Sequence, residues 1–546
     1  MDSNRYRPAA APDDRYAIGS SAAGAASAQL LLSACVVLSA VAFTYALSRP
    51  FSWLLGVVPD DAFYYFTIAR NIATRGLSSF DGLNATNGYH PGWMAVLVVL
   101  ARLVPGPIPF VRVALAAAFA LHVGATALLV AALKRWLPAA AALAAGALWV
   151  INPLPINLAI QGMEASLYIF SLALALWVYS ARIAPRAGAA STGAPSDRDL
   201  VLFGLSLSLC VLSRTEAIVL VAVVVAAVAW SLRPSSARSL AVIGASFVAG
   251  FTPWLVYTHH AVGSYVQHSG SMKMLWASSA PPQPILARTT SVLRYVLGGW
   301  VTYPVLGVPG GAMIDLRVIG DTAITAALVF AVVRGITRGE TRPLARAAIV
   351  LLAGTGLTGV VYALFFSDMQ YWYKAQPGFV FFVLVYVAAE SILRRRGPAV
   401  GRWALGVALG VMALSLVARL KTLNSYPWQR DVLSSQQRFD RMVPEGAVFG
   451  AFNAGIPGYF SSHTVVNLDG LVNNPIYDYY RRRELDRYID ESPIAYIADE
   501  VDALKRATKF ARRDVPLEVV AKERLTGWPL SEYRYLWRVS RDRGAR

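Results

Sequence analysis

The chain has 546 residues, of which 56% are hydrophobic and only 15% charged, and its formal net charge is +18. Soluble domains carry about 25% charged residues. This composition, with its long apolar runs, excludes a soluble globular protein and indicates a multi-pass membrane protein. Much of the basic excess lies in short loops between apolar runs, which is typical of the positive-inside pattern and argues against a nucleic-acid partner.

The N-terminal part predicts a tail and an anchor. Residues 1–28 are polar and rich in Ala and Ser, and we expect a disordered cytoplasmic tail. The run from Leu30 to Leu47 is too long for the core of a signal peptide, and no cleavage site follows it. We therefore interpret it as an uncleaved signal anchor.

Apolar runs predict eleven membrane spans between residues 29 and 420. With these spans every basic loop falls on one side, which places the N-terminus in the cytoplasm and the C-terminal segment outside the plasma membrane. The spans are 29–49, 111–133, 138–156, 164–182, 199–213, 216–232, 238–257, 319–334, 344–365, 376–393 and 402–420.

Two shorter apolar segments remain, Trp93–Leu103 and Val292–Val308. Pro or Gly flanks each of them, so we expect re-entrant or interfacial helices on the outer face. If either crosses the membrane, the count rises from 11 toward 13.

From about Lys421 the composition changes, and charges of both signs appear between short apolar runs. This pattern predicts a small α/β domain over residues 421–546, outside the membrane. The expected strands are Ala447–Ala451, Thr464–Leu468, Ile494–Ala498, Glu518–Val520 and Tyr533–Val539.

Two adjacent acids, Asp60 and Asp61, follow the first span at the start of the outer loop 50–110. Ionisable groups at a membrane boundary are costly and usually functional. A partly desolvated carboxylate beside a like charge has a raised proton affinity and suits a general base. An N-cap would explain one acid but not both, and we favour Asp61 as the base.

Other polar residues near the outer helix ends are candidates for substrate binding. Asn87, Tyr89 and His90 form a turn before an apolar helix, and His90 is either a phosphate or sugar ligand or only a turn residue. Glu164 begins a span, where it either lines a cavity or caps the helix. Arg214 either pairs with Glu216 in a tight turn or faces an anion.

Three more candidates lie further along the chain. Lys273 follows Ser269 and Gly270 on an outer loop, a plausible phosphate cradle. Tyr371 in Tyr371–Lys374 either stacks on carbohydrate or belongs to an interfacial belt, and the belt is the simpler reading. Asp469, in Asn467-Leu468-Asp469-Gly470, either forms an ordinary turn or faces the acids.

Taken together, these residues resemble the type-C fold (GT-C) glycosyltransferases that use lipid-phosphate sugars, such as protein O-mannosyltransferases, aminoarabinose transferases and mycobacterial arabinofuranosyltransferases. The resemblance rests on Asp60-Asp61, Ile68–Asn71, Thr86–Pro91, Gly162–Glu164, Ser213-Arg214, Ser269-Gly270 with Lys273, and Asn467–Gly470. The acids here are adjacent rather than separated by one residue, which argues against a metal-chelating pair of the oligosaccharyltransferase kind.

The resemblance implies an inverting transfer from a polyprenyl-phosphate sugar to a glycan, lipid or protein hydroxyl. Asp61 or Asp60 would act as the base, and Lys273 and Arg214 would stabilise the departing lipid phosphate. No cofactor is expected, and a divalent metal is not favoured. The alternative is a transporter or flippase of lipid-linked sugars, although the sequence shows no inverted repeat.

Overall fold

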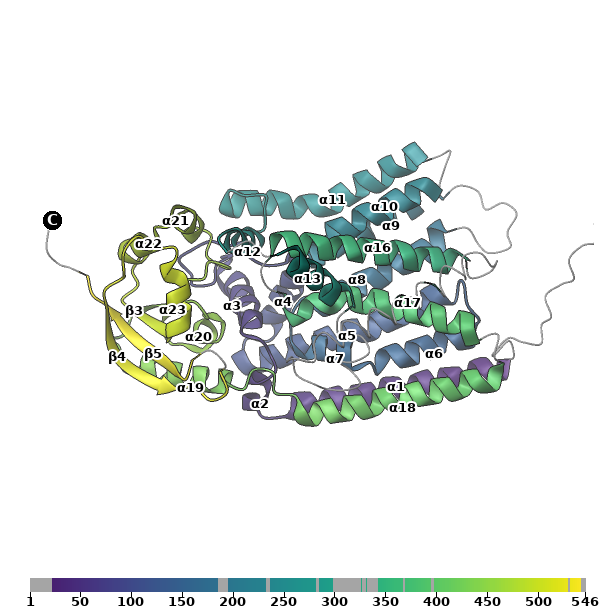
Figure 1. Ribbon diagram of the computed structural model, residues 1–546, viewed down its shortest axis with the longest axis horizontal. Coiled ribbons are helices and arrows are strands. Elements are labelled where there is room, and N and C mark those ends of the chain that lie inside the picture. Colours follow the sequence, from purple (N-terminus) through teal and green to yellow (C-terminus); the bar gives the residue numbers. More distant parts are fainter. Residues whose placement is uncertain are drawn as a thin grey trace, which may run out of the picture.

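The computed structural model describes residues 22–184, 195–231, 236–280, 284–297, 342–366, 369–393, 397–528 and 531–541, with residues 326 and 330. A bundle of long helices carries an α/β domain at one end (Figure 1). The helical elements of the bundle are α1 (Ala22–Ser48), α2 (Phe51–Leu55), α3 (Asp60–Arg75), α4 (Pro91–Leu103), α5 (Pro107–Leu133), α6 (Ala139–Val150), α7 (Pro153–Ile160), α8 (Ala165–Val178), the π-helical turn η2 (Tyr179–Ile183), α9 (Asp197–Ser213), α10 (Ala217–Ser231), α11 (Ser236–Val262), α12 (His268–Ser278), α13 (Ile285–Leu297), α16 (Arg342–Phe365), the 3-10 turn η4 (Tyr371–Lys374), α17 (Ala375–Leu393) and α18 (Pro398–Thr422).

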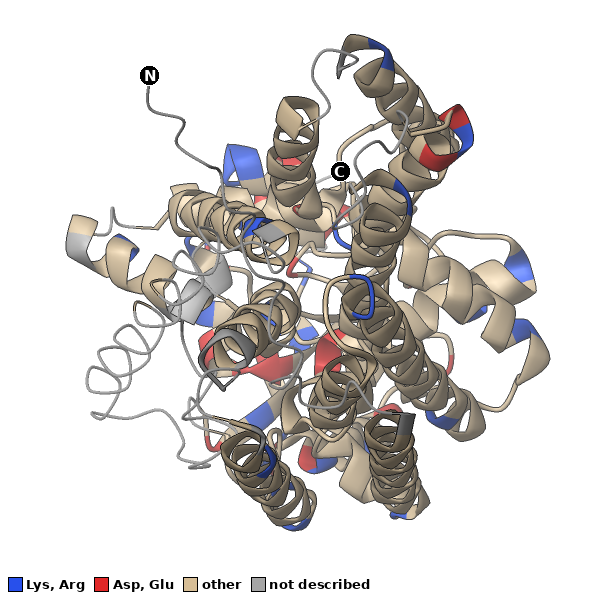
Figure 2. Cartoon of the chain, turned by 90° about the vertical axis from the view of Figure 1, so that its right-hand side faces the viewer, with Lys and Arg blue, Asp and Glu red and all other residues tan. Residues whose placement is uncertain are grey.

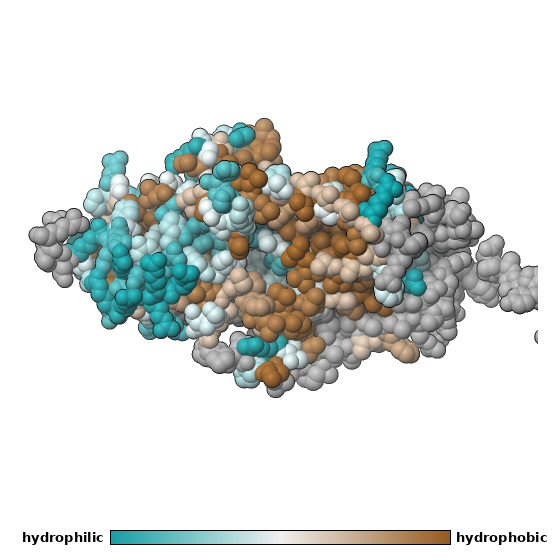
Figure 3. All heavy atoms as spheres, turned by 90° about the horizontal axis from the view of Figure 1, so that it is seen from above, coloured by the Kyte–Doolittle hydropathy of each residue, from teal (hydrophilic) through white to brown (hydrophobic). Residues whose placement is uncertain are grey.

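Proline marks the beginnings of several of these helices, because it fits the first helical turn and stops the preceding one. It opens α4, α5, α7 and α18. Figure 3 shows a broad apolar surface over the bundle and a hydrophilic surface over the C-terminal domain. The bundle therefore exposes the kind of surface that a membrane covers.

Within the described residues, six helices are long and apolar enough to cross a membrane: α1, α5, α8 with η2, α11, α16 and α18. The pair α6 and α7, bent by 46°, would be a seventh. The multi-pass helical architecture is thus confirmed. Every expected span except 319–334 coincides with a helix or a helix pair, and that span lies outside the described residues apart from 326 and 330.

Residues 22–28 belong to α1 and not to a disordered tail, since α1 begins at Ala22; residues 1–21 lie outside the described part. The apolar segment Trp93–Leu103 is helical and belongs to α4. Of the segment 292–308, only the start is described, in α13.

The C-terminal domain contains all five expected strands. Their order in the sheet is β2-β1-β3-β5-β4, in which β1 pairs with β2 and β3 in parallel and β5 pairs with β3 and β4 antiparallel. The elements are α19 (Gln429–Asp440), β1 (Val448–Ala451), α20 (Gly455–Phe460), β2 (Thr464–Asn467), α21 (Ile476–Arg482), α22 (Leu485–Glu491), β3 (Tyr496–Glu500), α23 (Val501–Thr508), β4 (Leu517–Arg524) and β5 (Tyr533–Val539).

The parallel half of this sheet points at the bundle. The carboxyl ends of parallel strands share one edge, where open α/β sheets usually bind ligands. Here that edge meets α3: the Phe63 ring lies 5.5 Å from the Tyr459 ring and 5.7 Å from the Phe460 ring, both on α20. Figure 1 shows α3, α12 and α20 together at this junction.

Candidate functional site

The site begins with α3. Pro59 precedes it in an extended conformation, and Asp60 and Asp61 occupy its first turn, where carboxylates interact well with the helix dipole. The helix ends at Gly76, whose φ of 70° would strain a larger residue. This short helix thus presents both acids at the junction between the bundle and the C-terminal domain.

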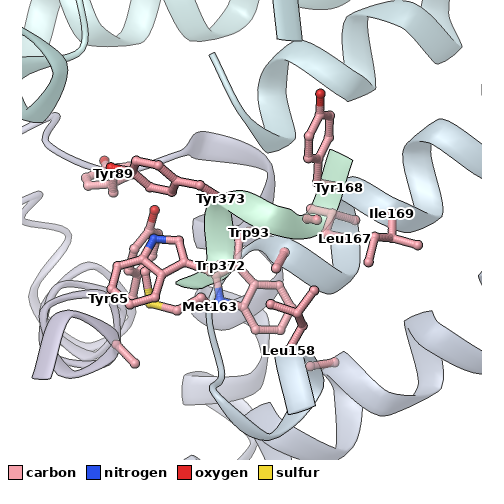
Figure 4. Packing of buried hydrophobic residues seen from close by; sticks show 14 of the residues in the cluster. Tyr65, Tyr89, Trp93, Leu158, Met163, Leu167, Tyr168, Ile169, Trp372 and Tyr373 are labelled. Atoms are coloured by element: carbon pink, nitrogen blue, oxygen red, sulfur yellow. The ribbon is translucent and has the colours of Figure 1, made fainter. Parts of the chain in front are cut away.

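A cavity that is partly open to solvent lies beside Asp61, with about 460 Å³ of empty volume when the open solvent at its mouth is included. Figure 4 shows part of its wall, where Tyr65, Met163 and Trp372 lie together with Tyr89 and Tyr373 next to them. The lining residues are Asp61, Tyr64, Tyr65, Ile68, Gly88, Tyr89, His90, Met163, Glu164, Gln267, Ser269, Lys273, Trp372, Tyr373, Leu471 and Val472.

Lys273 on α12 places a positive charge in this cavity. Its Nζ donates a hydrogen bond of 2.6 Å to Tyr373 Oη and lies 5.2 Å from the centre of the same ring. Burial acts to lower the pKa of Lys273, but Tyr373 and Asp61 outweigh it and hold this pKa above its ordinary value. The cavity therefore contains a carboxylate and a firmly protonated amine that interact electrostatically.

Below the cavity lies a buried ion network. The Arg214 guanidinium, which is 3% exposed, pairs with Glu164 and Glu216, and its Cζ lies 4.5 Å from the centre of the Tyr373 ring. Tyr362 Oη donates to Glu216. Two carboxylates already pair with Arg214. Of the two alternatives for this residue, an ion pair with Glu216 or an anion site, the structure contains the ion pair. Among the described residues, no hydrogen bond reaches the other oxygen of Glu164, Oε2, which is buried.

His90 joins this network to the cavity. Its Nε2 lies 3.9 Å from Glu164 Oε1, and the Thr215 backbone N–H points at its Nδ1 from 3.4 Å. Burial lowers the pKa of His90, so the imidazole is neutral. A neutral ring with a donor at Nε2 can offer or relay a hydrogen bond at the edge of the cavity.

Asn87 has a different place from the one expected. Its side chain is fully buried, and Nδ2 donates to Thr258 Oγ1 and Val266 O, while Oδ1 accepts from His268 N and Asn474 Nδ2. These four bonds use every position of the amide. Asn87 thus ties α11, α12 and the C-terminal domain together beside the cavity.

Tyr89 does line the cavity, but its hydroxyl is engaged at 2.7 Å with Ser78 Oγ. Tyr371 is half-buried next to the wall, and its neighbours Trp372 and Tyr373 belong to the aromatic lining of the cavity. Because η4 is a 3-10 turn, adjacent side chains point in different directions, and the sequence alone did not show which ring faces inward.

The C-terminal domain completes the site. Asp469 Oδ2 lies 3.2 Å from Tyr64 Oη, and burial together with Asp61 raises the pKa of Asp469 to about 7. Leu471 and Val472 form one side of the cavity. The turn after β2 is therefore a polar lip facing the acids rather than an isolated turn.

Asp60, by contrast, is absent from the described lining of the cavity. Its carboxylate accepts hydrogen bonds from Gly455 N at 2.9 Å and Ile456 N at 2.7 Å, in the C-terminal domain. Burial raises its pKa to about 7 against the effect of these two donors. Of the two adjacent acids, only Asp61 faces the cavity.

Sequence reasoning missed Tyr64, Tyr65 and Gln267. The two tyrosines follow the acids directly, and an amphipathic helix with a buried Phe63 and Phe66 leaves their hydroxyls near polar partners. The position of two tyrosines directly after the two acids, on an amphipathic helix, was the sequence signal from which they could have been predicted. Among the described residues, no group of three or more His, Cys, Asp or Glu side chains is arranged to hold a metal ion.

Comparison with solved structures identifies the fold. ArnT from Cupriavidus metallidurans bound to undecaprenyl phosphate matches with a TM-score of 0.55 and 14% identity, over 95% of this chain and 98% of ArnT. ArnT in the apo state gives a TM-score of 0.57 and 14% identity over 92% and 97% of the two chains. An oligosaccharyltransferase, AglB from Archaeoglobus fulgidus with an inhibitory peptide and a dolichol-phosphate, gives 0.46 and 12% over 92% and 74%.

These matches confirm that the chain has the GT-C fold, as its motifs predicted. At 14% identity the likeness to ArnT concerns the fold alone. Residues 428–540 match a family described as a domain of unknown function (DUF8728). No curated protein matches the sequence.

Proposed function

We propose that this protein is a membrane glycosyltransferase that transfers a sugar from a polyprenyl-phosphate donor to an acceptor hydroxyl. The observation that carries the proposal is the cavity in which Asp61 and Lys273 both lie, beneath a C-terminal domain that contributes Leu471 and Val472 to the wall. The ArnT fold supports it, because the crystallised relative holds undecaprenyl phosphate.

Asp61 is the general base in this proposal. It takes the proton from the acceptor hydroxyl, whose oxygen then attacks the anomeric carbon of the sugar. As the new C–O bond forms, the bond from the anomeric carbon to the phosphate oxygen breaks, and its electron pair leaves with the polyprenyl phosphate. A single base and a direct displacement invert the anomeric configuration.

Lys273 stabilises the negative charge that develops on the leaving phosphate. A fixed cation in a site with little water acts strongly on such charge and needs no reorganisation during the reaction. Ser269 and Gln267 supply neutral hydrogen-bonding groups on the same wall. Trp372 and Tyr373 offer aromatic faces on which a sugar ring can stack.

The membrane arrangement follows from the basic loops. Lys and Arg mark several helix ends at the side of the bundle opposite the C-terminal domain (Figure 2). With this side in the cytoplasm, the cavity and the C-terminal domain lie at the outer face of the plasma membrane, where a glycan, lipid or protein acceptor is within reach. Polar groups gathered at one end of the bundle favour transfer over transport.

Purified protein in detergent is offered a panel of polyprenyl-phosphate sugars with candidate acceptors, and sugar loss from the lipid is followed by mass spectrometry. A general base contributes about 10²–10⁴-fold, so we expect Asp61→Asn to reduce turnover by that factor while the protein stays folded. Asp514→Asn, an exposed position in the C-terminal domain, is the matched control.

Full turnover by Asp61→Asn would refute its role as the base. Movement of the lipid-linked sugar across liposome membranes, without any new glycosidic bond, would instead support a flippase.

A further inference from the structure

Five consecutive backbone N–H groups, from Phe452 to Ile456, donate to side-chain oxygens. We call this segment between β1 and α20 the 452–456 amide row. Its first two N–H groups donate to Asp499 Oδ2, the third lies 3.2 Å from Tyr64 Oη, and the last two donate to the two oxygens of Asp60. Asp499 belongs to the C-terminal domain, whereas Tyr64 and Asp60 belong to α3.

The position of the amide row in the fold explains why it holds an anion. It follows β1, the central parallel strand, whose neighbours β2 and β3 lie on either side. The amide row therefore lies at the topological switch point, where the strand order of the sheet reverses. Turns of this kind direct their N–H groups at negative ligands in many α/β domains. Here the occupant is a carboxylate of the same chain, supplied by the helical bundle.

The fit at the amide row is tight. A Cβ atom on Gly455 would lie 2.1 Å from the backbone oxygen of Asp60 and 2.7 Å from its Oδ2, so only glycine allows this approach. Behind the row, Asn453 Nδ2 donates to Glu500 Oε2 at 2.8 Å and fixes the segment to the end of β3. The carboxylate of Asp60 is therefore held by a part of the domain that is itself braced.

This contact determines where Asp61 points. Successive residues of an α-helix are about 100° apart around its axis, so Asp60 and Asp61 cannot face the same direction. With Asp60 in the amide row, Asp61 lies at the cavity. A loss of the contact would leave the start of α3 joined to the C-terminal domain by weaker interactions, among them the hydrogen bonds of Tyr64 and the aromatic contacts of Phe63.

We propose that Asp60 is a positioning residue: its contact with the 452–456 amide row docks the C-terminal domain on α3 and orients Asp61 toward the substrate. The inference rests on the proposed role of Asp61 as the base. It assigns the adjacent acids two different tasks, and it makes the docked C-terminal domain a requirement for turnover.

A double-mutant cycle separates positioning from chemistry. Asp60→Asn weakens the contact from the bundle side, and Gly455→Ala weakens it from the domain side without altering any acid. Since a displacement of about 1 Å can cost on the order of 10²-fold, we expect each variant to lower kcat about 10–100-fold. The donor KM should stay within about twofold, because the cavity residues that hold the donor are unchanged.

Coupling between the two variants is the decisive result. The two substitutions remove the same contact, so the double variant should be no slower than the slower of the two single variants. In Gly455→Ala, which removes no charge, the acidic limb of the pH profile should stay where it is, because Asp61 remains the titrating base. Gly410→Ala, which adds a methyl group at a site with no heavy atom within 4 Å, is the control and should keep wild-type activity.

The proposal would be overturned if Gly455→Ala turned over normally while Asp60→Asn was inactive, or if the losses in kcat of the two single variants multiplied in the double variant. Either result would indicate that Asp60 acts chemically. If Gly455→Ala does not fold, Asp499→Asn loosens the row from behind and replaces it in the cycle.

Hydrogen exchange tests the contact independently of activity. In Asp60→Asn, the amides of residues 452–456 and those in the first turn of α3 should exchange faster than in the wild type. Unchanged exchange at either place would overturn the proposal even if no donor were ever turned over. Faster exchange without turnover in the wild type would instead refute only the proposed glycosyl transfer.

Discussion

Gly88 lies against Leu471 where the bundle and the C-terminal domain meet beside the cavity, and its replacement by alanine tests that contact. A Cβ atom at residue 88 would lie 1.9 Å from the carbonyl oxygen of Leu471 and 3.0 Å from its carbonyl carbon. Ordinary carbon–oxygen contacts begin at about 3.3 Å. The two segments must therefore separate by roughly 1.4 Å to admit one methyl group.

Neither segment can yield without disturbing the site. The turn after β2 is held by hydrogen bonds from Gly470 N and Leu471 N to the side chains of Asn467 and Asp469, at 3.0 and 2.8 Å. The loop before α4 is held by the four bonds of Asn87. Strain therefore passes to the cavity wall. Overpacking of this kind costs about 1–3 kcal/mol.

We expect Gly88→Ala to lower kcat by about 10²-fold, since misplacement by about 1 Å has that effect. The thermal midpoint and the donor-dependent rate are measured in the same detergent, beside Gly410→Ala as the control for adding a methyl group. A folded Gly88→Ala protein whose kcat stays within about twofold of the wild type would refute the reasoning, because the C-terminal wall would then play no part in turnover.

Two further predictions concern the charged groups. Tyr373→Phe removes the hydrogen bond from Lys273 and should raise the donor KM about fivefold, the equivalent of about 1 kcal/mol. Because the pKa of Lys273 is raised, the amine stays charged at any pH below that pKa, and the wild-type donor KM should stay flat from about pH 7 to 9. A wild-type KM that rises over this range, or an unchanged KM in Tyr373→Phe, would contradict the role of Tyr373. Glu216→Gln breaks a buried ion pair and should cost about 3 kcal/mol of stability. Asp197→Asn, which loses the exposed pair with Arg238, should cost less than about 1 kcal/mol. Equal thermal midpoints for the two variants would show that the buried network adds nothing to stability.

The sequence predicted the fold well because apolar runs and strand alternation are local signals. All five strands lie at or within a few residues of their predicted positions. The predicted start of α1 was wrong, because an Ala- and Ser-rich segment resembles a flexible tail although alanine is the strongest helix former.

The candidate site was predictable in part for a similar reason. Asp61, His90 and Glu164 lie near helix ends and Lys273 lies on the short helix α12, and the structure brings all four to one cavity. The pair Glu164–Arg214 joins residues far apart in the chain, so no spacing reveals it. Which ring of η4 faces inward depends on the packing of a 3-10 turn, which the pattern of aromatic residues does not encode.

The adjacent acids show how helix geometry turns one motif into two functions. From the sequence, Asp60 and Asp61 look like equivalent candidates for the base. The helical rotation between neighbours separates them: one carboxylate enters the amide row of the C-terminal domain, and the other enters the cavity. An insertion of one residue between them would turn the second acid away by about 100°. Adjacency is therefore the arrangement that lets one short helix both bind the domain and present a base.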